Sequence, residues 1–297
     1  MKISLPEIWT LLLMAGTSGF AIFVAEFFFI PAGISQTTSG SGNLFLIFIF
    51  LGLTILFTGV ILLVARRRGL RSIRIIFIIL TLYVIFWISL PIADIFVSIQ
   101  PIPLTVAIYE VYGIWFLIPA VMGYLLIFKN EWYVTDTAGF MLSAGLAAAW
   151  GLELQAWYSV ILLVAFALYD YISVYKTKHM VTLARTAFSS DLPMLFVIPS
   201  STGFKMKDID MDHREEGKPD AVLLGFGDIA MPSILVVSST VSYGFALPFF
   251  LLPIFGAMIG LVTLFLTARR PAPGLPYINS GAIAGFLMAY LLFSAHL

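Results

Sequence analysis

The chain has 297 residues, of which 61% are hydrophobic and 11% are charged, and its formal net charge is zero. A soluble domain carries about 25% charged residues, so this composition excludes an ordinary soluble protein. The lack of cysteine excludes disulfides and thiolate metal sites, and we expect no nucleic-acid partner.

Apolar segments recur from end to end, and each is long enough to cross a hydrocarbon core of ~30 Å. We therefore predict an all-α polytopic membrane protein with nine transmembrane helices in a single domain, 1–297. The helices are expected at residues 7–30, 44–65, 73–98, 103–127, 134–151, 155–177, 221–241, 245–267 and 275–296. A long polar loop, about 178–220, separates the first six helices (about 7–177) from the last three (about 221–296). The first apolar segment is too long for a cleaved signal peptide and lacks a small-residue cleavage site.

Lysine and arginine predict the orientation of these helices. With nine spans and a cytoplasmic N-terminus, all 16 basic residues fall in cytoplasmic segments and none falls in an outer loop. This matches the excess of positive charge that cytoplasmic loops carry. We therefore expect a multi-pass protein of the cell membrane whose N-terminus and 178–220 loop are cytoplasmic.

Six acidic residues fall within or beside the predicted spans. Three of them, Glu26, Asp94 and Glu110, lie toward the outer ends of their helices, and Glu153 lies in a short outer turn. A solvated or interfacial rim explains these four. The other two are deeper. Asp170 precedes Lys176 at the cytoplasmic end of the sixth helix, and Asp228 follows Asp220 at the cytoplasmic start of the seventh. At 1.5 Å per residue they lie roughly 9 and 12 Å from the inner boundary, so they can meet.

Two facing carboxyl groups can share one proton and hydrolyse a peptide bond. The ionised group takes a proton from water while the protonated group polarises the carbonyl. Two other interpretations stay open from position alone. The carboxyl groups could hydrogen-bond the helices together, or they could bind a cation or proton in a channel or transporter. Gly225 and Gly227 favour access by another backbone, although glycines in membrane helices also serve close packing.

Three motifs carry a resemblance to a known family. "YD" at Tyr169–Asp170 followed by "GFGD" at Gly225–Asp228 resembles the presenilin and signal peptide peptidase family of intramembrane aspartyl proteases. The third mark of that family is Pro-Ala-Leu at the start of the last helix. This chain has "PGLP" at Pro273–Pro276, with Gly274 in place of the usual alanine. The chain is most similar to an archaeal presenilin homologue, and the resemblance covers its whole length.

The resemblance implies that Asp170 and Asp228 are the catalytic pair of a GxGD-type aspartic endopeptidase. It implies that the other motif residues belong to the active site or border the substrate cleft; these are Tyr169, Gly225, Phe226, Gly227, Pro273, Gly274 and Leu275. No metal or organic cofactor is expected. The implied substrates are single-span membrane proteins or signal-peptide-like helices in the lipid bilayer. Obligate partner subunits are not evident, and a homo-oligomer is left open.

Two further expectations concern the 178–220 loop. Its apolar stretch "LPMLFVIPS", residues 192–200, is too short to span, and we expect it at the membrane surface as a cover near the cleft. In presenilins the corresponding loop is cut autocatalytically, and the sequence leaves open whether this occurs here. In the alternative of a channel or ion-coupled transporter, the same two aspartates form the ion site, but the inverted repeat that transporters often show is not visible.

Overall fold

The structure is a computed structural model that describes residues 5–30, 45, 47–49, 52–53, 56, 70–101, 103–129, 131–175, 195–200, 221–267 and 273–294. Helices form nearly all of these residues. The α-helices are α1 (Leu5–Val24), continued by the π-helix η1 (Ala25–Phe29), then α3 (Leu70–Ser98), α4 (Leu104–Phe128), α5 (Trp132–Glu153), α6 (Ala156–Tyr175), α8 (Phe226–Ser242), α9 (Leu247–Thr267) and α10 (Leu275–Phe293). The strands are β1 (Leu195–Pro199) and β2 (Ala221–Gly225).

The predicted all-α membrane fold is confirmed at the level of its helices. Each described α-helix corresponds to one of the predicted segments, with ends that differ by a few residues. The predicted helix at 44–65 lies mostly outside the described residues. Six helices of the described chain are long and apolar enough to cross a membrane. The exact number of spans stays a prediction.

The start of the predicted helix 221–241 is wrong. Residues 221–225 are strand β2, which pairs antiparallel with β1 in the register Val197 opposite Leu223, and the helix begins only at Phe226. Within the predicted surface stretch 192–200, residues Leu195–Pro199 form strand β1. Its position at the membrane surface as a cover stays a prediction. Short apolar runs fit a strand and a buried helix equally well, so periodicity alone could not distinguish them.

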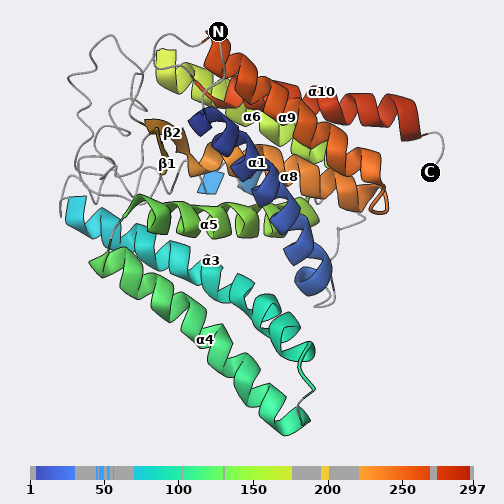
Figure 1. Cartoon of the computed structure of the whole chain (residues 1–297). Coiled ribbons are helices and arrows are strands. Elements are labelled where there is room, and N and C mark those ends of the chain that lie inside the picture. The colour runs from blue at the N-terminus through green and yellow to red at the C-terminus, as the bar shows by residue number, and fades with distance from the viewer. Residues whose placement is uncertain are drawn as a thin grey trace.

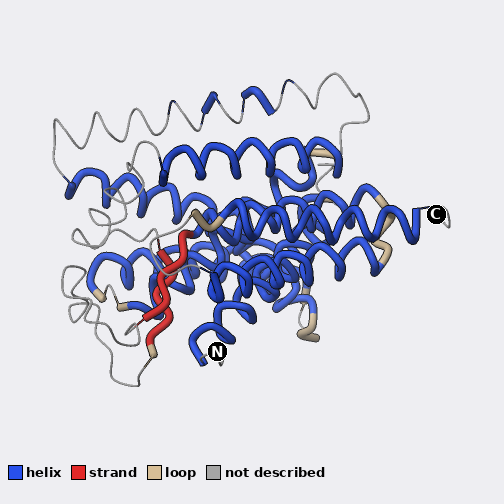
Figure 2. The backbone as a smooth tube through the Cα atoms, turned by 90° about the horizontal axis from the view of Figure 1, so that it is seen from above, coloured by secondary structure: helices blue, strands red, loops and turns tan. Residues whose placement is uncertain are grey.

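Helix α5 lies at the centre of the bundle. It packs against α8, α1 and α3, while α10 runs along α9, and α4 contacts mainly α3. Figure 1 shows α1 crossing α5, and the α3–α4 pair projecting from the remaining helices. The two strands lie at one end of the bundle in both Figure 1 and Figure 2. The buried face of α5 consists largely of alanine, glycine and serine, which lets its neighbours approach closely.

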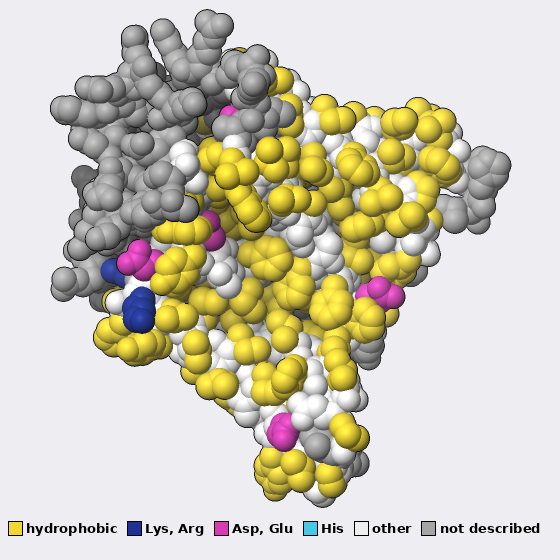
Figure 3. Space-filling view, in the orientation of Figure 1, with side chains coloured by type: hydrophobic (Ala, Val, Ile, Leu, Met, Phe, Trp, Pro, Cys, Tyr) yellow, Lys and Arg dark blue, Asp and Glu magenta, His cyan; other side chains and the backbone are white. Residues whose placement is uncertain are grey.

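The outer surface of the described chain is apolar. Large hydrophobic side chains such as Leu291, Tyr109 and Phe48 are exposed. Hydrophobic side chains cover most of the described face in Figure 3, and acidic and basic ones are few and lie mainly toward its margins. Such a surface suits lipid tails, which are as apolar as the side chains that face them. The chain is an integral multi-pass membrane protein.

Helices α9 and α10 make backbone contact through glycines. A methyl group at Gly256 would overlap the backbone of Gly281, and a methyl group at Gly281 would overlap the backbone of Gly256. One turn away on each helix, Gly260 and Gly285 lie equally close to the opposite backbone, at Tyr277 and Leu252. Each helix thus carries two glycines four residues apart, a spacing that allows close crossing of membrane helices. This contact holds the start of α10 in place.

Replacing Gly281 with alanine should therefore destabilise the protein. The methyl group must force α9 and α10 apart, and such overpacking costs about 1–3 kcal/mol. Gly113→Ala in α4 is the matched control, because a methyl group there meets nothing within 4 Å. The measurement is the Tm of each purified variant in the same detergent. Equal Tm values for the two variants would contradict the backbone contact.

Candidate active site

Helix α6 presents Asp170 on its buried face. Phe166, Asp170 and Ser173 are spaced four and three residues apart and are all buried, so they form one stripe of the helix. Asp170 is only 4% exposed. Its neighbour Tyr169 lies off this stripe and is 40% exposed. The stripe faces α10 and α8, against which α6 packs.

The carboxylate of Asp170 is held by the backbone at the start of α10. Its Oδ2 accepts a hydrogen bond from the Leu275 N–H at 3.2 Å, and the Gly274 N–H also donates to this carboxylate. The first N–H groups of a helix lack intrahelical partners, so the start of α10 provides donors for an anion. Leu275 and the preceding Pro273 are buried.

Asp228 lies in the first turn of α8, directly after strand β2. Its Oδ2 accepts the N–H of Gly225, the N-cap residue, at 3.1 Å. This is the reverse half of a capping box, in which a carboxylate at the third helical position bonds the N-cap backbone. The positive end of the helix dipole favours a negative charge at this position. Asp228 is half-buried.

The two carboxyl groups converge on one turn. A methyl group at Gly274 would lie 3.3 Å from Cγ and from both carboxylate oxygens of Asp228, while the backbone of Gly274 and Leu275 bonds Asp170. The charges of the two aspartates interact electrostatically. Three segments that are distant in sequence therefore bring two carboxyl groups together: α6, the junction of β2 and α8, and the turn before α10.

Two neighbouring motif residues, Phe226 and Gly227, have opposite environments. Gly227 is exposed, and a side chain at this position would meet nothing within 4 Å, so it leaves open space beside Asp228. Phe226 is 8% exposed and points into the core, where its ring packs edge-on against Phe196 of β1 with centroids 4.6 Å apart. Phe226 therefore anchors the start of α8 in the core, whereas Gly227 leaves free space beside Asp228.

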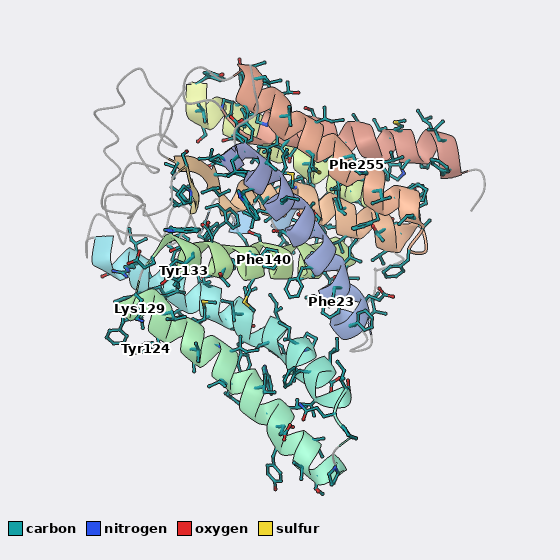
Figure 4. The ribbon with its side chains drawn as sticks, in the orientation of Figure 1. Phe23, Tyr124, Lys129, Tyr133, Phe140 and Phe255 are labelled. Carbon is teal, nitrogen blue, oxygen red and sulfur yellow. The ribbon has the colours of Figure 1, made fainter. Side chains whose placement is uncertain are left out.

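Helix α5 supports the junction of β2 and α8 at two points, neither of which is evident from the sequence. The ring of Phe226 fits against Gly139 so closely that any side chain there would overlap it. One turn further along α5, the Ser143 hydroxyl donates to the Phe226 carbonyl at 3.2 Å. Phe140, the residue after Gly139 and labelled in Figure 4, stacks on Phe20 of α1 with ring centroids 5.4 Å apart. A spacing of four residues between Gly139 and Ser143 is compatible with one helical face, but the sequence alone does not identify their partner.

The donor set of the site suits proton transfer. Within the ranges that the structure describes, no group of three or more His, Cys, Asp or Glu side chains is arranged to hold a metal ion. Two adjacent carboxyl groups can exchange roles as proton donor and acceptor, which is the requirement for acid–base activation of water. Each is held by a backbone N–H, so their positions do not depend on flexible side chains.

A multi-pass membrane protein with two carboxyl groups converging inside its helix bundle is the class that fold and site define. The family model described as signal-peptide peptidase, presenilin aspartyl protease matches residues 11–295. The chain belongs to this family. A search of the curated proteins finds no match to this chain.

Solved structures of the same family are similar over nearly the whole chain. The structure of a presenilin family intramembrane aspartate protease in the C222 space group has 31% sequence identity and a TM-score of 0.61, and the match covers 97% of this chain and 98% of that one. A structure in the P2 space group has 30% identity and a TM-score of 0.62, with the same coverage.

The close fit of the Phe226 ring against Gly139 predicts how substitutions at these two positions change the stability. Gly139→Ala should lower the Tm, because the methyl group displaces the Phe226 ring from a packed position, at a cost of about 1–3 kcal/mol. Phe226→Leu combined with Gly139→Ala should recover part of this loss, since the shorter side chain leaves room for the methyl group. Additive effects of the two substitutions would show that the residues do not share this contact.

Proposed function

We propose that this chain is an intramembrane aspartyl endopeptidase of the GxGD type in which Asp170 and Asp228 activate water. The observation that carries the proposal is the convergence of both carboxyl groups on the Gly274–Leu275 turn. Family membership supports it, because the family is described as an aspartyl protease family.

The reaction needs one carboxylate, one carboxylic acid and a water molecule. The carboxylate accepts a proton from water as the water oxygen bonds to the carbonyl carbon, and the carboxylic acid donates its proton to the carbonyl oxygen. The resulting gem-diol collapses when its C–N bond breaks: the carboxylic acid donates a proton to the leaving nitrogen, and the carboxylate accepts a proton from a gem-diol hydroxyl. The pair then holds one proton again.

The substrate must be extended at the bond that is cut, because the amides of a helix are engaged and shielded. Strand β2 suits an extended chain. The Gly225 N–H donates to Asp228, so this N–H points away from β1. The N–H of Leu223, two residues earlier in the strand, points in the same direction. A peptide that pairs with this edge would run toward the carboxyl groups. Gly225–Gly227 and Pro273–Leu275 would border it, and single-span membrane proteins or signal-peptide-like helices are the expected substrates.

We infer that the site faces the cytoplasmic half of the bilayer. The sequence supports this orientation, since a cytoplasmic N-terminus brings all 16 basic residues to that side. Two described basic residues lie near the end of α4: Arg74 donates to the Leu126 carbonyl at 3.1 Å, and Lys129, labelled in Figure 4, is the C-cap of α4. This orientation makes the 178–220 loop cytoplasmic, and we propose the cell membrane as the location of the protein.

Asp170→Asn and Asp228→Asn should each abolish cleavage of a generic single-span substrate by the purified protein in detergent. Loss of an acid or base should reduce the rate at least about 100-fold, while the Tm stays near that of the wild type. Asp94→Asn is the matched control, because it removes an exposed carboxylate on α3. Full activity in either dyad variant would contradict the mechanism.

The same preparations distinguish the alternative of a cation or proton channel or transporter. A protein that cuts no substrate, but carries an ion flux in liposomes that depends on Asp170 and Asp228, would replace the protease proposal. The family assignment does not favour that result.

The glycine at position 274 generates a separate prediction. Its backbone angles, φ −77° and ψ −44°, suit any residue, so only space matters there. Gly274→Ala, which restores the usual family residue, needs a shift of a few tenths of an ångström in Asp228 and should keep kcat/KM within about threefold. Gly274→Val should displace the carboxylate and lower kcat/KM about 100-fold. A fully active Gly274→Val protein would show that the carboxylate does not rest against this position.

A further inference from the structure

A third carboxylate, Asp136 on α5, contacts the hairpin rather than the dyad. Its Oδ1 accepts the backbone N–H of Val197 in β1 at 2.8 Å. Asp136 is half-buried and lies in the second turn of α5, the helix against which β1 packs. A carboxyl oxygen accepts a backbone N–H whether the group is ionised or protonated. The family motifs do not include this residue.

The bond reveals which edge of the hairpin α5 covers. Val197 lies opposite Leu223 in the register of the two strands. Since the Val197 N–H bonds Asp136, it points away from β2 and lies on the outer edge of β1. Asp136 therefore occupies a donor that an extended peptide would otherwise use on that edge. The edge of β2 leads directly to Asp228, and it is the edge with which we expect a peptide to pair.

Asp136 shares its face of α5 with the two residues that support Phe226. Asp136, Gly139 and Ser143 are spaced three and four residues apart, which brings them onto one stripe of the helix. Asp136 holds β1, and the other two hold the ring and the carbonyl of Phe226. Helix α5 thus holds β1 at Val197 and the start of α8 at Phe226.

We propose that Asp136 is a positioning residue of the protease: by accepting the Val197 N–H it fixes the hairpin on α5 and so sets the position of β2 and Asp228. This inference rests on the proposed function. The important feature of Asp136 is its acceptor oxygen, because Val197 offers a single N–H and accepting that N–H requires no charge.

The first test compares Asp136→Ala with Asp136→Asn. Active sites are titrated with a peptide transition-state isostere, and cleavage of a single-span substrate is expressed per titrated site. Asp136→Ala should turn over about 10- to 100-fold more slowly per site, since small misplacements of reacting groups have effects of this size. Asp136→Asn retains an acceptor and should stay within about threefold of the wild type. Thr137→Ala is the matched control, because Thr137 is the exposed neighbour on α5.

The second test removes the same hydrogen bond from the other side. Val197→Pro lacks the N–H, and proline is tolerated where a strand's N–H points away from its partner. Its rate per site should fall as in Asp136→Ala, and the double variant should fall no further than either single one. If Asp136→Ala does not fold, Asp136→Asn and Val197→Pro decide the question.

Each outcome has a definite meaning. A merely structural role would lower the number of titrated sites and leave the rate per site unchanged, which would overturn the inference. An Asp136→Asn protein as slow as Asp136→Ala, or multiplicative effects in the double variant, would overturn it as well. These results leave the proposed function intact as long as the wild type cleaves and the dyad variants do not. A wild type that does not cleave overturns both.

Discussion

Holding two carboxyl groups inside an apolar helix bundle is the constraint on which the site depends. An isolated charge there is costly unless it is paired or hydrogen-bonded. This protein meets the requirement with backbone N–H groups at helix starts: Leu275 bonds Asp170, and Gly225 bonds Asp228. Because these donors belong to the main chain, the carboxyl groups are fixed by the path of the backbone, and the presence of Asp228 in an apolar run has a physical explanation.

The short hairpin follows from the same constraint. If a helix began at Ala221, Asp228 would lie in its third turn, and the N–H of Gly225 would bond within the helix. The strand β2 ends at Gly225 instead, so its N–H points to Asp228, and the carboxylate lies in the first turn of α8. The small side chains of α5 allow the hairpin and the Phe226 ring to approach the centre of the bundle.

The sequence predicted much of the fold and part of the candidate site. Long apolar runs bounded by polar breaks located the described helices, and the motifs at Tyr169–Asp170, Gly225–Asp228 and Pro273–Leu275 indicated the family that the comparisons confirm. The strand pairing was missed because it joins residues 195–199 to residues 221–225, which are far apart in sequence, and local periodicity does not detect such pairing. The contacts of Asp136, Gly139 and Ser143 were missed because they depend on tertiary packing. In the sequence, Asp136 is only a polar residue near the start of a predicted helix, and nothing there indicates its partner.

The central proposal is that Asp170 and Asp228 act as a pair on a peptide. The most direct test is equilibrium binding of a hydroxyl-containing peptide isostere, which imitates the gem-diol, to the purified wild type and to each single aspartate variant. We predict that the wild type binds one isostere per chain and that replacing either aspartate greatly lowers the affinity. Binding that survives the loss of either carboxyl group would contradict it.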